Sequence, residues 1–107
     1  MRFDASMHVD NGAASIRLAG ELDSQSAPRL QELITDAALG TVQRLVLLVR
    51  DLTYMSSAGL RCLVFAHQKL GPSVDIVMIG AQPAVTEIME LTGFDKSVIM
   101  HDAAEPS

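Results

Sequence analysis

The chain has 107 residues, of which 49% are hydrophobic and only 4% aromatic, and its net charge at neutral pH is −5. This length fits a single domain over residues 1–107 with an aliphatic core. The acidic balance disfavours nucleic acid or an anionic membrane as the main partner, because both require clustered Lys and Arg. The sequence lacks a membrane-spanning stretch and a secretory signal, and its single cysteine, Cys62, cannot form an internal disulfide, so we expect a cytoplasmic protein.

The N-terminal segment predicts an antiparallel β-hairpin. Apolar and polar side chains alternate over residues 1–9 and again over residues 14–19, and the turn sequence Asp10-Asn11-Gly12 separates the two stretches. Gly20-Glu21-Leu22-Asp23 then breaks the alternation, which predicts the end of the second strand.

A first helix is expected next. Ser24 and Ser26 are candidate N-caps, and Pro28 fits only in the first turn of a helix. Gly40 is the expected C′ residue. One apolar face of this helix is marked by Leu30, Leu33, Ile34 and Ala37.

The stretch from Leu45 to Leu70 predicts a buried strand, a corner of small residues and a helix. Residues 45–49 form an uninterrupted apolar run, closed by Arg50-Asp51, and such a run is typical of a parallel strand buried on both faces. The corner is Ser56-Ser57-Ala58-Gly59. Apolar residues then recur at helical spacing, at Leu60, Leu63, Val64 and Leu70.

Three further elements complete the predicted fold. Gly71-Pro72 end the second helix, and residues 74–79 predict another buried strand. Pro83 begins a third helix that Gly93 ends, and residues 98–100 predict a short last strand. The order ββαβαβα(β) implies right-handed parallel crossovers. We therefore expect an α/β fold in which a mixed sheet, an antiparallel N-terminal hairpin plus parallel strands, is covered by helices.

Enzymatic chemistry is poorly supported by the sequence motifs. Ser57 precedes Gly59, but Met55 stands where a nucleophile elbow has its first glycine. The three histidines lack metal-ligand spacing, and no phosphate-binding loop of the Walker type is present. Cys62 lies within a helical apolar pattern and is expected to be a small core residue. We therefore expect neither an enzyme nor a bound metal or cofactor.

Ser56 and Ser57 are the candidate functional residues. One of them is expected to cap the helix, which is a common structural role for serine. A hydroxyl at a helix N-terminus also lies among unpaired backbone N–H groups, and this position favours a phosphate. The small residues of the corner, with apolar Tyr54, Met55 and Leu60 beside it, predict an open docking surface around a modifiable hydroxyl.

Two motifs carry a resemblance to a known family. Residues 51–61, DLTYMSSAGLR, form the first motif, and Gly20-Glu21-Leu22-Asp23 followed by Ser26-Ala27-Pro28 forms the second. Together with the element order, they resemble the STAS-domain anti-sigma-factor antagonists over about residues 3–100. The resemblance implies a STAS-like mixed sheet covered by helices.

The resemblance also implies a partner-switching function. Such proteins, when unphosphorylated, bind and sequester an anti-sigma factor that is a serine kinase with a histidine-kinase-like ATPase fold. The kinase phosphorylates the antagonist, the complex dissociates, and a serine phosphatase resets it. By the family's pattern the acceptor lies two residues before Gly59, which makes it Ser57. Many members carry Asp immediately before the acceptor, and because this chain has Ser56 there, Ser56 is the alternative acceptor.

The resemblance further implies a docking face built from the loop at residues 21–26, the loop at residues 51–57 and the start of the second helix. Its expected partner-binding residues are Asp23, Ser24, Met55, Ser56, Ala58, Gly59 and Leu60. Asp23 has a structural alternative, as a cap or turn residue, and Leu60 has one as a core residue. Arg61 either pairs with Asp51 or stays solvated.

Two other functions compete with this interpretation. One is a STAS scaffold or nucleotide-binding module of a lipid-transport or stress-sensing complex, which predicts tight nucleotide binding without phosphorylation. The other is a small serine hydrolase, which predicts ester turnover.

Overall fold

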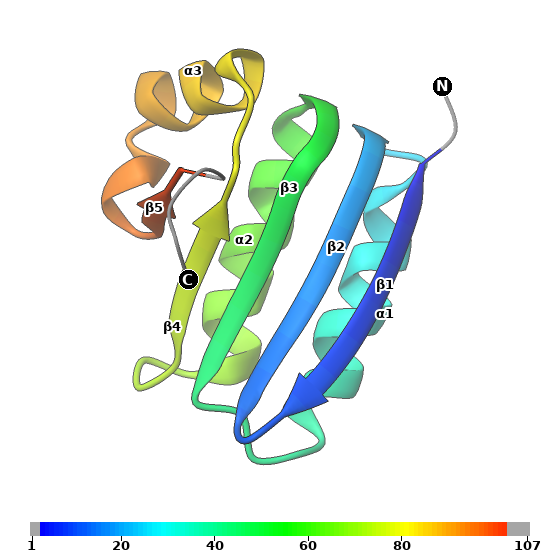
Figure 1. Cartoon of the computed structure of the whole chain (residues 1–107), viewed down its shortest axis with the longest axis vertical. Coiled ribbons are helices and arrows are strands. Elements are labelled where there is room, and N and C mark those ends of the chain that lie inside the picture. The colour runs from blue at the N-terminus through cyan, green and yellow to red at the C-terminus, as the bar shows by residue number, and fades with distance from the viewer. Residues whose placement is uncertain (1–2, 103–107) are drawn as a thin grey trace.

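The computed structural model describes residues 3–102, in which strands and helices alternate after an opening hairpin (Figure 1). The elements are β1 (Asp4–Asp10), β2 (Ala13–Leu22), α1 (Ala27–Ala38), β3 (Arg44–Met55), α2 (Ser57–Leu70), β4 (Asp75–Ile79), α3 (Pro83–Thr92), a short 3₁₀ helix (Phe94–Lys96) and β5 (Ile99–His101). This order confirms the predicted ββαβαβα(β) series. Residues 1–2, at the start of the predicted first strand, lie outside the described residues.

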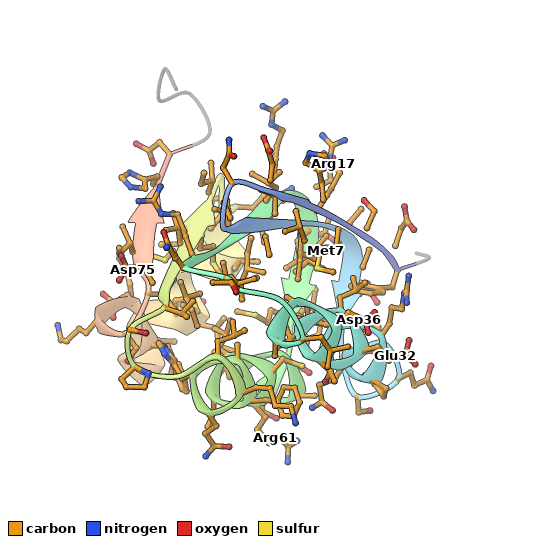
Figure 2. The ribbon with its side chains drawn as sticks, turned by 90° about the horizontal axis from the view of Figure 1, so that it is seen from below. Met7, Arg17, Glu32, Asp36, Arg61 and Asp75 are labelled. Atoms are coloured by element: carbon orange, nitrogen blue, oxygen red, sulfur yellow. The ribbon has the colours of Figure 1, made fainter. Side chains whose placement is uncertain are left out.

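The five strands form one mixed sheet in the order β1-β2-β3-β4-β5. β1 pairs antiparallel with β2, and each later neighbouring pair is parallel. α1 and α2 connect successive parallel neighbours, so right-handed crossovers place both helices on the same face of the sheet. Figure 1 shows them behind the sheet, and Figure 2 shows the same two layers from below. The predicted mixed sheet covered by helices is confirmed.

The placement of both helices on one face corrects the prediction for the central strand. Leu45, Leu47 and Val49 of β3 are buried in the core, whereas Val46 and Leu48, which point the other way, are only half-buried. The Arg17 side chain of β2, which pairs with Leu48, projects away from the helices (Figure 2). The expectation of a strand buried on both faces is therefore wrong, because both crossover helices pack on the same side.

The β2 strand continues through the segment where the sequence predicts its end. Gly20 and Leu22 keep the inward alternation of this strand and are both buried. Gly20 has φ of +91°, a conformation in which a residue with a Cβ is strained. The threonine hydroxyl of Thr53 donates a hydrogen bond to the Gly20 carbonyl oxygen at 3.0 Å. Residues 20–23 therefore form the strand's irregular end instead of breaking it at Gly20.

The β3 strand also runs past its predicted end, to Met55. Two register shifts between β2 and β3 give β3 one extra residue each time. The spacing of its buried residues consequently changes from two to three, at Val49, Leu52 and Met55. Such β-bulges re-aim the neighbouring side chains, and here Thr53 and Tyr54 are both exposed.

The core is aliphatic, as the composition predicts. Its largest fully buried side chains are Ile16, Leu18, Leu22, Leu30, Ile34, Leu45, Leu47, Val49, Leu52, Leu63, Met78 and Met89. Cys62 is fully buried among them, and burial raises the pKa of its thiol above the ordinary value. A raised pKa keeps the thiol protonated and unreactive, so the prediction of a small core residue is confirmed.

The predicted helix boundaries also agree with the structure. Ser26 is the N-cap of α1, and Gly40 follows its C-cap, Leu39. Pro83 begins α3, and Gly93 ends it in the left-handed conformation, with φ of +79°.

Candidate functional site

The carboxyl ends of β2 and β3 lie side by side and bring the two sequence motifs together. Leu22, the last residue of β2, pairs with Met55, the last residue of β3. The backbone N–H of Ser56 donates to the Leu22 carbonyl oxygen at 2.9 Å. Asp23 begins the loop that follows Leu22, so this loop and the serine corner are neighbours at one end of the sheet (Figure 1).

Ser56 is the N-cap of α2. Its backbone is extended, with φ of −91° and ψ of −178°, and its hydroxyl oxygen accepts a hydrogen bond from the Ala58 N–H at 3.1 Å. The Ser56 carbonyl oxygen accepts from the N–H groups of Gly59 and Leu60 at 3.0 and 3.3 Å. The side chain is half-buried. Ser56 therefore has the structural role that the sequence assigned to one of the two serines.

Ser57 is the first residue of α2, and its side chain is exposed. Among residues 3–102, its hydroxyl has no hydrogen-bond partner. Because the cap is already provided by Ser56, the Ser57 hydroxyl is available at the surface. The structure thus assigns the cap to Ser56, and Ser57 is the serine of the corner with an exposed hydroxyl.

The remaining residues of the corner are packed inward. Ala58, Gly59 and Leu60 are buried, and Met55 is only 3% exposed. A Cβ atom at Gly59 would overlap the side chains of Met55 and Leu22, so this glycine lets α2 approach the end of the sheet closely. These buried residues pack beneath the exposed serine corner and fix the position of α2 relative to the sheet.

This burial corrects the expected apolar surface. Met55 was expected at the docking face and Leu60 either there or in the core, and both side chains belong to the core. The large apolar side chain of residues 51–60 that is exposed is Tyr54, which is 50% exposed and three residues before Ser57. The physical reason is the second β-bulge of β3, which turns Tyr54 outward and Met55 inward. The change of apolar spacing at Leu52 and Met55 is the sequence signal for it.

The loop at residues 21–26 is held by its own hydrogen bonds. The Oδ1 atom of Asp23 accepts from the backbone N–H groups of Gln25 and Ser26 at 3.0 and 3.1 Å. The Ser26 hydroxyl donates to the Glu21 carbonyl oxygen at 2.8 Å and accepts from the Asp23 N–H at 2.9 Å. The bonds from the Ser26 and Gln25 backbone lower the pKa of the Asp23 carboxyl, so it is charged at neutral pH. Asp23 therefore has the structural turn role, while remaining half-exposed, and Ser24 is exposed beside it.

Arg61 is exposed on α2, one helical turn after Ser57. The ion pair found within residues 3–102 joins Arg29 to Glu32, so Arg61 is not paired with Asp51. The solvated alternative that the sequence left open for Arg61 is the one observed.

Within the described part of the chain, no group of three or more His, Cys, Asp or Glu side chains is placed to hold a metal ion. No helix formed by residues 3–102 has the length and apolar character needed to cross a bilayer.

The family follows from these observations and from comparison with known proteins. The model of the STAS domain family matches residues 4–105. The chain therefore belongs to the STAS domain family, which confirms the resemblance drawn from its two motifs.

Similar proteins include characterised and structurally solved members of one class. The chain is 28% identical over 97 residues to the anti-sigma-F factor antagonist RsfB of Mycobacterium tuberculosis, covering 87% of this chain and 80% of that protein. A crystal structure of an anti-sigma factor antagonist from Mycobacterium paratuberculosis superposes with a TM-score of 0.84 at 24% identity, covering 94% of this chain and 86% of that one. The anti-sigma factor antagonist SpoIIAA in its unphosphorylated form gives 0.80 at 23% identity, covering 97% and 90%. These two structures establish the likeness of fold.

Proposed function

We propose that this STAS domain is an anti-sigma-factor antagonist that acts by partner switching. In the unphosphorylated state it binds and sequesters an anti-sigma serine kinase, and phosphorylation of Ser57 releases that kinase. A serine phosphatase restores the binding form. The protein is thus a regulatory binding partner and a kinase substrate in the cytoplasm, and has no catalytic role of its own. Similarity to RsfB, itself an anti-sigma-F factor antagonist, supports the class of function.

One observation carries the proposal for Ser57. Its hydroxyl is exposed at the start of α2 and has no partner among residues 3–102, whereas the Ser56 hydroxyl is engaged with the Ala58 N–H. In the transfer, the Ser57 oxygen attacks the γ-phosphorus of ATP, the bond from that phosphorus to the β-phosphate oxygen breaks, and the hydroxyl proton passes to a base of the kinase. ADP is the leaving product. A hydroxyl that already accepts a capping hydrogen bond from the backbone is a poorer acceptor site, because phosphorylation would disturb the cap.

The added charge can act as a switch without unfolding the domain. A phosphoserine carries about −1.5 to −2 charges at pH 7. The N-terminus of α2 stabilises that charge by roughly 0.3–1 kcal/mol. A partner carboxylate or nucleotide phosphate about 4 Å away opposes each added charge by up to ~4 kcal/mol at an effective dielectric of 20. After discounting for screening, the affinity falls by about ten- to a thousandfold.

The proposed docking surface, which we call the corner surface, consists of Asp23, Ser24, Tyr54, Ser56 and Ser57. The first two belong to the loop after β2, and the others belong to the junction of β3 and α2. Met55, Ala58, Gly59 and Leu60 support this surface from the core, and any contact they make with a partner is secondary.

The test is incubation of the purified protein with its cognate kinase and ATP, followed by mass spectrometry of the peptide that spans residues 51–61. We expect one added phosphate on Ser57, none in the Ser57→Ala variant, and a phosphate still present in the Ser56→Ala variant. A phosphate on Ser56 would refute the assignment of the acceptor. Tight ATP or GTP binding by the isolated domain, with no phosphate transferred, would instead favour a nucleotide-binding scaffold.

A further inference from the structure

The exposed side of α2 carries a cationic side chain close to the proposed acceptor. Ser57 and Arg61 are four residues apart, so they lie on the same side of the helix, one turn from each other. Both are exposed. Figure 2 shows the Arg61 side chain projecting from α2 on the side away from the sheet. Within residues 3–102 it makes no ion pair with a carboxylate.

The backbone at this helix end has little hydrogen-bonding capacity left for a phosphate. The Ala58 N–H is bonded to the Ser56 hydroxyl oxygen, and the N–H groups of Gly59 and Leu60 are bonded to the Ser56 carbonyl oxygen. A phosphate on Ser57 can therefore gain from the helix dipole, but it cannot take these three N–H groups without breaking the cap. Of the first-turn N–H groups within residues 3–102, that of Ser57 remains without a partner, so further donors for the phosphate oxygens must come from side chains.

The other charged groups near this corner do not supply that donor. Glu21, near the end of β2, and Asp23, in the loop that follows, carry carboxylates, which oppose a second anion. Lys69 is twelve residues further along α2 than Ser57, which is about 18 Å along the helix axis. Arg29, on α1, is engaged with Glu32.

We propose that Arg61 is the counter-ion of phosphorylated Ser57: its guanidinium binds the phosphate oxygens across one turn of α2 and keeps the group dianionic at neutral pH. This inference rests on the proposed modification of Ser57. A guanidinium presents a planar set of N–H donors that matches two phosphate oxygens at once. The second pKa of a phosphoserine lies near 6, so a neighbouring cation moves it further below neutral pH.

The counter-ion affects how much negative charge phosphorylation adds to the surface at neutral pH. Without a counter-ion, a fraction of the phosphate carries only one negative charge at pH 7, and the nearby Asp23 carboxylate increases that fraction. With Arg61 bound, the doubly charged form of the phosphate is favoured further, and the group is held against α2. Before phosphorylation, Arg61 gives the exposed start of α2 a positive charge. After phosphorylation, the same surface has a net negative charge, so a docked partner meets a charge of the opposite sign.

The experiment installs phosphoserine at position 57 during translation by amber suppression, so that no kinase is needed. The phosphate is titrated by ³¹P NMR in the otherwise unmodified chain, in Arg61→Gln and in Lys69→Gln. Lys69→Gln is the matched control, because it removes one exposed positive charge from the same helix, far from Ser57. We expect Arg61→Gln to raise the phosphate pKa by about 0.2 to 0.7 unit, the shift that corresponds to a surface ion pair. Lys69→Gln should leave it nearly unchanged.

A second variant separates charge from packing. Arg61→Lys keeps the positive charge and should retain most of the lowered pKa, whereas a purely structural role of Arg61 predicts that Lys and Gln behave alike. The same phosphate pKa in the unsubstituted chain and in Arg61→Gln would overturn the inference. Because no kinase takes part, that result is distinguishable from a failure of the proposed function, which would appear as a kinase that leaves Ser57 unmodified.

Discussion

Alanine at each of the two neighbouring serines should have a different effect: Ser56→Ala should lower the stability of the domain, and Ser57→Ala should abolish its phosphorylation. Ser56→Ala removes the hydroxyl oxygen that accepts the Ala58 N–H at 3.1 Å, and the loss of such an N-cap typically costs about 1 kcal/mol, within a range of roughly 0.5–2 kcal/mol. For a domain of this size, 1 kcal/mol lowers the melting temperature by roughly 4–8 °C. Ser57→Ala removes an exposed hydroxyl, so its effect on the free energy of unfolding should stay within about 0.5 kcal/mol.

The assay for this prediction combines urea unfolding, followed by circular dichroism, with phosphate transfer by the cognate kinase. Ser56→Ala should unfold at a lower urea concentration and still accept a phosphate. Ser57→Ala should unfold like the unsubstituted chain and accept none. Ser73→Ala, which changes an exposed serine in the connection between α2 and β4, is the control and should be silent in both measurements. If Ser57→Ala lost as much stability as Ser56→Ala, the assignment of the cap to Ser56 would be refuted.

Three further variants probe the surroundings of the site. Gly59→Ala should lower the free energy of unfolding by about 1–3 kcal/mol, because its Cβ would overlap core side chains, whereas Gly40→Ala, with its nearest atom 3.9 Å away, should be tolerated in the same urea titration. Asp23→Asn should remove a pH-dependent part of the stability, because the folded state lowers the pKa of the Asp23 carboxyl. The charged carboxylate stabilises the fold above the unfolded pKa of about 4, and this stabilisation is lost as pH falls through the folded pKa. Asp23→Asn should therefore be less stable than the unsubstituted chain at pH 7, and urea titrations of the two proteins should converge towards pH 3. Tyr54→Ala should weaken kinase binding by roughly tenfold in calorimetry with little loss of stability, because the ring is half-exposed on the corner surface; unchanged binding would remove Tyr54 from that surface.

Local sequence patterns were sufficient to predict the elements of the fold. The turn at Asp10-Asn11-Gly12 and the caps at Ser26 and Gly93 lie where the sequence indicates, because each depends on a few consecutive residues. The strand order, by contrast, depends on contacts between distant segments, and it decides on which face of the sheet each crossover helix packs. Local patterns therefore did not predict that α1 and α2 cover the same face, and Val46 and Leu48 were expected to be more buried than they are.

The junction of β3 and α2 lies where the sequence predicts it, but the orientation of its side chains was not predicted. The corner at Ser56 and Ser57 was identified from its small residues, and its place at the end of β3 followed from the fold. The orientation of Tyr54 and Met55 was not predicted, because two β-bulges reverse the expected alternation, and a bulge depends on pairing with β2. The role of Asp23 likewise required the hydrogen bonds of its own loop, which fix it as a turn residue.

The most direct test of partner switching is the affinity of the cognate kinase for two forms of the domain, one unmodified and one carrying phosphoserine at position 57. Calorimetry with both forms, at the same pH and salt concentration, should show binding that is about ten- to a thousandfold weaker after phosphorylation. Equal affinity of the two forms would show that charge on this exposed hydroxyl does not govern the complex, and the proposed mechanism would be wrong.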